Sequence, residues 1–296
     1  MPELTSPSLL ACPMDGLPLT RHAGCWHCPT GHSFDIARQG YINLLPVQNK
    51  RSKDPGDSKE MVLARHEFLS AGFYQPIADA VSDLVSACTP ADNAVSILDA
   101  GCGEGYYLRE LKKNALASNG SRLHLTGLDI SKWAVMAAAR QDKTSEWIVG
   151  SNANLPLLPA TQDVVLCLFG FPVYAEFARV LKQNGVLIKV DAGADHLLEL
   201  REVIYPSIKI ASQTPDTPPG FTLLEQRSLR YTIDITSQEQ IARLLAMTPH
   251  LYRTNAEGRA RAAALNELSV TVDVQIKSWG QNDQKIDQNL ITPSPA

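Results

Sequence analysis

The sequence predicts an α/β fold, in which a seven-stranded doubly wound sheet follows a small N-terminal domain. The chain has 296 residues, 44% of them hydrophobic and 20% charged, which is an ordinary globular composition with room for about two domains. Through the centre of the chain, short apolar runs alternate with helical patterns, as they do in doubly wound sheets. Three of the six cysteines stand within the first 28 residues, which marks this end as a separate unit.

The charge is distributed unevenly. The net charge of -4 argues mildly against a nucleic-acid-binding protein, because phosphate contacts are made mainly by Lys and Arg. Residues 1–53, however, carry five basic and three acidic groups, so this end is net basic. Its densest basic cluster, Lys50-Arg51-Ser52-Lys53, is typical either of a solvated loop or of a phosphate contact.

No segment predicts a membrane span. The longest nearly apolar run, Val164–Ala175, is much shorter than the ~18 residues that a transmembrane helix needs. The residues before Cys12 contain neither a basic residue nor an apolar stretch, so they do not form a signal peptide. We therefore expect an unprocessed cytoplasmic protein with no membrane contact.

The N-terminal cysteines predict a metal site. Cys25 and Cys28 are three residues apart, and His32 follows after four more. Tetrahedral zinc takes four ligands, and a short turn can bring two of them onto one ion. Segments this short cannot bury a core, so the metal would supply folding free energy.

We expect Cys12, Cys25, Cys28 and His32 as the zinc ligands. The first knuckle reads Cys-Pro-Met-Asp, so Asp15 is an alternative fourth ligand with an oxygen donor. The interpretation without metal is a degenerate finger held together by Trp26, Phe34 and Tyr41. In either case the finger would serve recognition, because four protein ligands leave no open coordination position for chemistry.

Local patterns place the helices and strands. A mobile linker rich in Pro, Gly and charge is expected over Lys50–Lys59, with a helix N-cap at Asp57 or Ser58. Helical patterns follow from Met61 to Leu69 and over Ile77–Ala87. The expected parallel strands include Val95–Ala100, Leu123–Asp129, Asp163–Phe169 and Gly185–Asp191, and Phe221–Leu224 and Val270–Ile276 form a final antiparallel pair.

A glycine-rich loop follows the first strand of this sheet. Asp99-Ala100-Gly101-Cys102-Gly103-Glu104-Gly105 leads into a helix that starts near Tyr106, and such a turn lets a ligand approach bare backbone. A dinucleotide site requires G-x-G-x-x-G, whose last glycine would replace Tyr106, so the spacing disfavours NAD. The pattern D-x-G-x-G-x-G instead resembles motif I of class I S-adenosylmethionine-dependent methyltransferases.

A carboxylate ends the second strand. Asp129 lies about one βα unit after the glycine-rich loop, and Ser131 is expected to cap the helix over Ala134–Arg140. A carboxylate at this position can accept hydrogen bonds from both ribose hydroxyls. The alternative for Asp129 alone is a turn residue. Residues 151–156, after the third strand, are then expected near the adenine.

Finger, linker and core together resemble one family, the zinc-finger guanine-N1 methyltransferases of bacterial large-subunit ribosomal RNA, known as the RlmA type. The resemblance is carried by Cys28-Pro29, His32–Asp35, Gly40–Gln48, Lys50–Ser58, Gly101–Tyr107, Gly127–Lys132, His196-Leu197 and Met247–Pro249. It implies a class I, Rossmann-like methyltransferase fold with a zinc-finger-like N-terminal domain. It also implies methyl transfer from S-adenosylmethionine to N1 of a specific guanine in 23S rRNA.

The resemblance further implies which residues contact the cofactor. It places Tyr74, Gly103, Glu104, Asp129 and His196 there, beside Asp99 and Gly101 of the glycine-rich loop. The ordinary alternatives are a packed tyrosine for Tyr74 and a helix-flanking residue for His196. The chain departs from the family at Asp15, where a zinc cysteine is expected, and over residues 169–172, which are expected to face the target base.

The expected domains are a zinc-finger-like RNA-recognition domain over residues 1–46 and a linker with helices over 47–92. The methyltransferase domain is expected over 93–280, and the polar residues 281–296 form a disordered tail. The sequence leaves open whether the chain forms a homodimer.

The sequence does not identify the general base of the reaction. Guanine N1 carries a proton at neutral pH, so a base must remove it, and Asp191 at the end of the fifth strand is a geometric candidate. Phe169 and Phe171 can stack on an extruded base, with core packing as the alternative. Two other functions stay open, namely a small-molecule methyltransferase and a non-catalytic RNA-binding or assembly protein.

Overall fold

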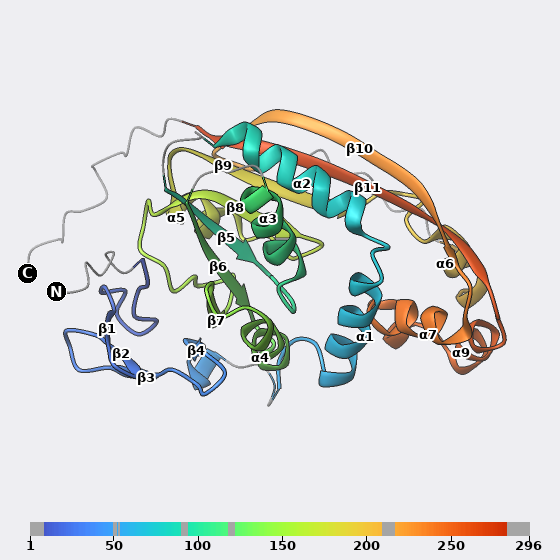
Figure 1. Cartoon of the computed structure of the whole chain (residues 1–296), viewed down its shortest axis with the longest axis horizontal. Coiled ribbons are helices and arrows are strands. Elements are labelled where there is room, and N and C mark those ends of the chain that lie inside the picture. The colour runs from blue at the N-terminus through green and yellow to red at the C-terminus, as the bar shows by residue number, and fades with distance from the viewer. Residues whose placement is uncertain are drawn as a thin grey trace, which may run out of the picture.

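A mostly parallel sheet forms the centre of the protein. The computed structural model describes residues 9–49, 52, 54–89, 94–117, 122–208 and 217–282, and within them the chain builds one eight-stranded sheet (Figure 1). In sheet order the strands are β10 (Phe221–Ile235), β11 (Leu268–Gln281), β9 (Leu181–Ala192), β8 (Gln162–Leu168), β5 (Val95–Ala100), β6 (Leu123–Asp129), β7 (Glu146–Val149) and β4 (Tyr41–Asn43). The chain order reverses between β5 and β8, which is where doubly wound sheets bind their ligands.

Seven of these strands confirm the predicted doubly wound sheet, and β4 adds an eighth at the edge. β4 comes from the N-terminal segment and pairs in parallel with β7, with Tyr41 opposite Trp147. β10 and β11 are much longer than predicted, and they pair from Phe221 opposite Gln281 to Ile235 opposite Leu268. The apolar pattern underestimates the length of β10, because this edge strand exposes most of its side chains to solvent.

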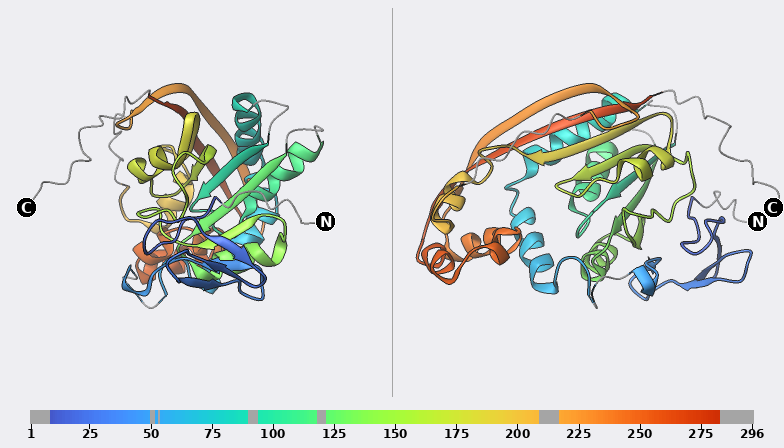
Figure 2. Two further views of the ribbon diagram at one scale, coloured as in Figure 1. Left: turned by 90° about the vertical axis from the view of Figure 1, so that its left-hand side faces the viewer. Right: turned by 180° about the vertical axis from the view of Figure 1, so that it is seen from behind.

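Helices cover both faces of the sheet. The helices α2 (Gln75–Cys88), α3 (Tyr106–Ala117) and α4 (Lys132–Gln141) lie on one face, and α5 (Tyr174–Val180) lies on the other (Figures 1 and 2). A second group lies beyond one end of the sheet: α1 (Lys59–Ser70), α6 (Leu198–Ile204), α7 (Gln238–Ala246), α8 (His250–Arg253) and α9 (Ala256–Ala263). Among the described residues, none of the helices combines the length and the apolar composition that a membrane crossing requires.

Two predicted helix caps are confirmed. Ser58 Oγ accepts a hydrogen bond from Met61 N at 3.3 Å, at the start of α1. Ser131 Oγ accepts one from Ala134 N at 3.2 Å, at the start of α4. Ser131 Oγ also donates a hydrogen bond to the Asp57 carbonyl at 2.7 Å. This bond holds the end of the expected linker against the start of α4.

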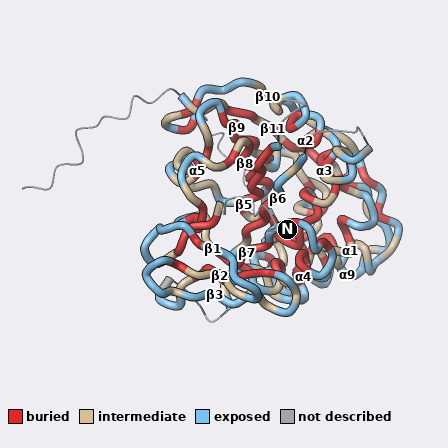
Figure 3. Tube along the Cα trace, turned by 60° about the vertical axis from the view of Figure 1, so that its left-hand side comes forward, coloured by how far each residue is buried: buried red, intermediate tan, exposed pale blue. Residues whose placement is uncertain are grey.

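The N-terminal ribbon shares its core with the main sheet. Its three short strands, β1 (Thr20–His22), β2 (Cys25–His27) and β3 (Ser33–Asp35), form a separate antiparallel sheet. Leu10 bridges to Leu157, and Ala11 N donates to the Pro156 carbonyl at 3.0 Å. The buried residues of the ribbon therefore continue into those beneath β6 and β7 (Figure 3). The predictions for residues 1–8 and 283–296, including most of the expected disordered tail, lie outside the described residues.

Trp147 and Trp279 are the largest fully buried side chains among the described residues, and two glycines make room for Trp147. A Cβ atom at Gly127 would lie 2.3 Å from the Trp147 ring, and one at Gly105 would lie 2.4 Å from it. Gly105 also has a φ of +79°, which disfavours any other residue. The glycine-rich loop and β6 are thus held directly against this indole.

We expect Gly127→Ala to lower the free energy of unfolding by about 1–3 kcal/mol, because an overpacked core must shift its side chains. Urea unfolding monitored by circular dichroism measures this. Gly24→Ala is the matched control, since a Cβ atom there meets nothing within 4 Å. Equal stability of the two variants would contradict the tight packing of Gly127 on Trp147.

Candidate functional site

The loop between β5 and α3 leaves open backbone at the point where the sheet order reverses. Gly101, Gly103 and Gly105 all have positive φ angles, of 103°, 55° and 79°. The amides of Gly101 and Cys102 donate to the Leu128 carbonyl at 2.8 and 2.9 Å, which ties the loop to β6. A Cβ atom at Gly101 would meet nothing within 4 Å. The loop therefore presents bare backbone to a ligand.

Asp129 lies beside this loop at the carboxyl end of β6. Its Oδ2 accepts a hydrogen bond from Gly103 N at 2.9 Å, and its Oδ1 accepts one from Ser131 N at 2.8 Å. Burial raises the pKa of Asp129, and these two amides act in the opposite direction. Each carboxylate oxygen keeps a second lone pair, so the oriented group can accept two hydroxyl groups of a ligand.

Asp99 is a buried carboxylate whose surroundings suit a ligand with a cationic donor. Its side chain is 1% exposed, and neither carboxylate oxygen has a hydrogen-bond partner among the described residues. Burial, and secondly the charge of Asp129, raise the pKa of Asp99 to about 8. Buried polar atoms are nearly always paired in folded proteins. A cationic donor, such as the ammonium group of an amino-acid moiety, fits this position.

The raised pKa of Asp99 predicts how stability without ligand depends on pH. An unfolded aspartate titrates near 3.8 and the folded Asp99 near 8, so between these values the folded state holds the extra proton. The free energy of unfolding therefore falls as the pH rises, by at most about 1.4 kcal/mol per pH unit. We expect the unliganded wild type to lose stability relative to Asp99→Asn between pH 5 and 8, measured by urea unfolding at fixed pH values. Parallel pH profiles of the two proteins would contradict this expectation.

The aromatic rings of Tyr74, Phe169 and His196 pack against one another and form a wall. Tyr74 precedes α2 and is buried, and its Oη lies 3.1 Å from His196 Nε2. The ring of Phe169, directly after β8, lies 6.1 Å from that of Tyr74 and 5.8 Å from that of His196. The structure thus brings together Tyr74 and His196, two of the predicted cofactor-contacting residues, with Phe169.

The protonation state of His196 follows from its surroundings. Burial lowers the pKa of His196 to about 4, so the ring is neutral and carries one N–H at neutral pH. Asp273 N donates to His196 Nδ1 at 3.3 Å, which leaves the proton on Nε2. His196 then donates to the Tyr74 oxygen, and the Tyr74 hydroxyl hydrogen is available to another acceptor.

Backbone strain marks the same wall. Phe169 and Leu197 have φ angles of 55° and 53°, in the left-handed region that residues other than glycine rarely adopt. Such strain concentrates at functional sites, where the surrounding structure holds it in place. Phe169 is 39% exposed and Phe171 is 89% exposed, so both rings are accessible beside the glycine-rich loop.

Two other predicted site residues, Glu104 and Asp191, already contact other side chains of the protein. Glu104 is 1% exposed, and its Oε2 accepts hydrogen bonds from Arg109 Nη2 at 2.8 Å and Gln141 Nε2 at 2.7 Å. Its Oε1 has no partner among the described residues. Asp191, the candidate base, lies 2.8 Å from Lys189 Nζ.

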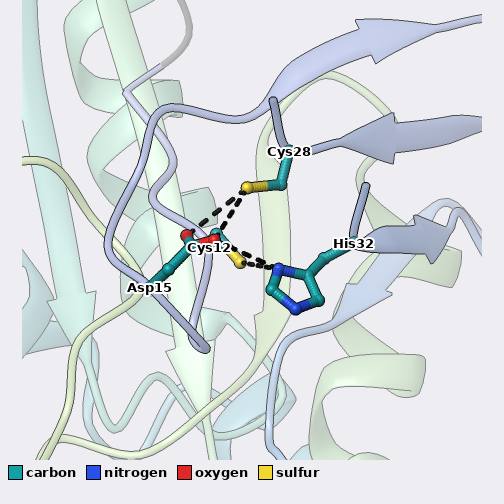
Figure 4. Close-up of side chains that lie close together, drawn as sticks. All are labelled: Cys12, Asp15, Cys28 and His32. Atoms are coloured by element: carbon teal, nitrogen blue, oxygen red, sulfur yellow. Dashed lines mark hydrogen bonds and ion pairs between the residues drawn. The ribbon is translucent and has the colours of Figure 1, made fainter. Parts of the chain in front are cut away.

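Four side chains of the ribbon converge on one point (Figure 4). The ligand atoms of Cys12, Asp15, Cys28 and His32 all lie within 4.8 Å of one another. Cys12 Sγ lies 3.5 Å from His32 Nδ1, and Asp15 Oδ2 lies 3.2 Å from both Cys28 Sγ and His32 Nδ1. A tetrahedral zinc site places neighbouring ligand atoms about 3.3–3.8 Å apart, so two thiols, an imidazole and a carboxylate fit this ion.

Cys25, which was expected as a ligand, is not part of this cluster. Its Sγ lies 3.0 Å from His27 Nε2. The extended strand β2, which runs from Cys25 to His27, separates Cys25 from Cys28. The structure therefore places Asp15 beside the other three predicted ligands, and Cys25 apart from them.

Arg65 is a site residue that the sequence analysis missed. It lies on α1 and forms an ion pair with Asp57 of the linker. Its Nη2 donates to the Met247 carbonyl at 3.0 Å, and its Nη1 would lie 3.7 Å from a Cβ atom at Gly103. A single arginine within a helical pattern carries no local signal, so only the packing of α1 against the loop could identify it.

Comparison with family models defines the class of protein. Residues 10–53 match the N-terminal zinc ribbon of the RlmA family, and residues 97–185 match a methyltransferase domain. Together with the doubly wound sheet, the glycine-rich loop and Asp129, these matches define a class I S-adenosylmethionine-dependent methyltransferase with an N-terminal zinc ribbon.

Relatives that are similar over most of the chain narrow this class to one family. The chain is 34% identical over 252 residues to YxjB of Bacillus subtilis (strain 168), covering 83% of this chain and 87% of that protein. It is 33% identical over 293 residues to a protein of Micromonospora griseorubida, covering 91% and 96%. The names of both relatives give them a proposed activity as 23S rRNA (guanine-N(1)-)-methyltransferases. The 23S rRNA (guanine(748)-N(1))-methyltransferase of Streptomyces fradiae is 28% identical over 275 residues, covering 89% and 94%. This chain belongs to the family of 23S rRNA (guanine-N(1)-)-methyltransferases.

Proposed function

We propose that the protein transfers a methyl group from S-adenosylmethionine to N1 of a specific guanine in 23S rRNA. The observation that carries the proposal is the similarity to relatives of that name over ribbon, linker and methyltransferase domain together. A shared cofactor domain alone would not distinguish RNA from a small molecule, because substrate choice depends on the residues outside it.

The residues around the glycine-rich loop are suited to hold S-adenosylmethionine. When bound, the cofactor supplies a methyl group on a positively charged sulfur. Asp129 is oriented to accept the ribose hydroxyls, and Asp99 is a buried acceptor for the ammonium group. Gly101 and Gly103 let the ligand approach the backbone, and Tyr74 and His196 close the site from the side of α2.

The aromatic wall positions the target base in this proposal. Phe169 is held in a left-handed conformation with its ring partly exposed, and aromatic side chains stack on unpaired bases. Neutral His196 keeps its proton on Nε2, so it is not an acceptor for the guanine N1 proton while Asp273 N donates to Nδ1. Asp191 stays the candidate base, with Lys189 as its ion-pair partner.

The ribbon and the linker are the proposed RNA-contacting parts. Cys12, Asp15, Cys28 and His32 would hold a zinc ion that stabilises the ribbon and takes no part in the transfer. A cavity of about 360 Å³ lies along the linker, lined by Asp54, residues 56–61, Trp133 and Tyr252. Tyr252 is 67% exposed, so a flanking base can stack there. The basic cluster at Lys50, Arg51 and Lys53 lies outside the described residues.

Transfer of labelled methyl groups to total RNA from a strain that lacks this gene tests the proposal. We expect label in 23S rRNA, recovered as N1-methylguanine at one position. Label in a small molecule, with none in RNA, would support a small-molecule methyltransferase instead. No binding of S-adenosylmethionine at all would support a non-catalytic RNA-binding or assembly protein. We also propose a cytoplasmic location, because ribosomal RNA lies there. Light scattering tests whether the chain forms a homodimer.

A further inference from the structure

Three segments that are distant in the sequence meet at Arg65. Asp57 belongs to the linker, Gly103 to the glycine-rich loop, and Met247 to the segment Met247–Pro249 that follows α7. Arg65 pairs with Asp57, donates to the Met247 carbonyl at 3.0 Å and faces the bare backbone of Gly103. No role assigned so far explains why the linker and the Met247 segment converge on the cofactor loop.

The guanidinium of Arg65 still has hydrogen-bonding capacity toward the site. An arginine has five N–H donors in a planar fork, and the contacts with Asp57 and the Met247 carbonyl use one N–H on each terminal nitrogen. The side chain is 26% exposed, and the absent Cβ of Gly103 leaves its Nη1 next to the loop backbone. A planar anion beside the loop can therefore take a bidentate pair of hydrogen bonds.

Two other basic side chains near the loop are not available to such an anion. Arg109 forms an ion pair with Glu104 at 2.8 Å, and burial lowers the pKa of His196 to about 4, so that its ring is neutral. Asp99 and Asp129 add negative charge to the same site. An amino-acid moiety bound here needs a positive partner for its carboxylate as well as an acceptor for its ammonium group.

We propose that Arg65 binds the carboxylate of the amino-acid moiety of S-adenosylmethionine, opposite Asp99 at the ammonium group. This role deepens the proposed function and depends on it only through the cofactor, not through the RNA. Asp57 and the Met247 carbonyl act as positioning groups, because they hold the guanidinium fork beside Gly103 before the ligand binds.

Isothermal titration calorimetry with two ligands tests this role on the full-length chain. S-adenosylhomocysteine carries the carboxylate, and its decarboxylated analogue keeps the ammonium group but lacks the carboxylate. We expect wild type to bind the decarboxylated analogue about 10- to 100-fold more weakly, because hydrogen bonds to charged groups are worth about 1.5–3 kcal/mol. In Arg65→Met the two ligands should bind with affinities that differ by less than about threefold.

Arg243→Met is the matched control. Arg243 lies on α7 and pairs with Glu67 of α1 at 2.7 Å, so its loss perturbs the same helix pair away from the loop. This variant should keep the wild-type difference between the ligands, and Arg65→Lys, which keeps the charge but not the fork, should show an intermediate difference.

Two outcomes would overturn the proposal. Equal affinities of wild type for both ligands would exclude a carboxylate contact, and this result needs no variant to fold. An Arg65→Met variant that weakens both ligands equally would assign Arg65 to the structure of the site. Absence of S-adenosylhomocysteine binding by wild type would instead contradict the proposed function, so the two failures are distinguishable.

Discussion

Replacing Asp129 with Asn is expected to weaken the binding of S-adenosylhomocysteine by about 100-fold or more. The carboxylate accepts hydrogen bonds from Gly103 N and Ser131 N at 2.9 and 2.8 Å, and an amide group cannot accept from both with its nitrogen. The variant also loses charge-assisted bonds to the ribose hydroxyls, each worth about 1.5–3 kcal/mol. Isothermal titration calorimetry measures the change.

Asp234→Asn is the control for this experiment. Asp234 is an exposed residue of β10, and it accepts a hydrogen bond from Ser269 Oγ at 2.6 Å. We expect its affinity for S-adenosylhomocysteine to match wild type. If Asp129→Asn also bound like wild type, Asp129 would serve only to shape the loop and not to hold the ligand.

Replacing Cys28 with Ser is expected to abolish stoichiometric zinc binding. Cys28 is buried and supplies one of the two thiols in the cluster. Without the metal, the three-residue strands of the ribbon have few contacts of their own, since small metal domains draw their folding free energy from the ion. Metal analysis of the purified protein measures the zinc content, and hydrogen exchange of β2 amides reports opening of the ribbon.

Cys25→Ser provides a matched control at the start of β2, the strand that ends directly before Cys28. Cys25 lies beside His27 and outside the cluster, so this variant should keep its zinc. Asp15→Asn should weaken the binding, because it removes the negative oxygen ligand. Loss of zinc in Cys25→Ser with retention in Asp15→Asn would reverse the assignment and restore Cys25 as the fourth ligand.

Much of the cofactor side could be predicted from local patterns. The spacing of Gly101, Gly103 and Gly105 reflects a tight turn with positive φ angles at all three positions. Asp129 ends a strand, and because parallel strands present their carboxyl ends at one edge, it was expected beside the loop. The caps at Ser58 and Ser131 are equally local, since each hydroxyl bonds an amide three residues away.

Local patterns do not predict two features of the N-terminal ribbon. Cysteine spacing allowed either Cys25 or Asp15 as the fourth ligand, and the choice depends on how the turn around Asp15 lies against Cys28 and His32. Likewise, nothing in Tyr41–Asn43 indicates that this strand joins the main sheet beside β7. The sharing of one core by ribbon and methyltransferase domain follows from that pairing.

By itself, the sequence determined the fold class, the positions of several strands along the chain, the glycine-rich loop and the similarity to a methyltransferase family, because these depend on short-range spacing and on burial patterns along one segment. Only the tertiary structure decided that Asp15 lies beside Cys12, Cys28 and His32, that Phe169 packs against Tyr74 and His196, and that Arg65 meets Asp57, Gly103 and Met247. The physical reason is that these contacts join residues up to 182 positions apart. Their formation depends on how whole elements pack, and no local pattern encodes that packing.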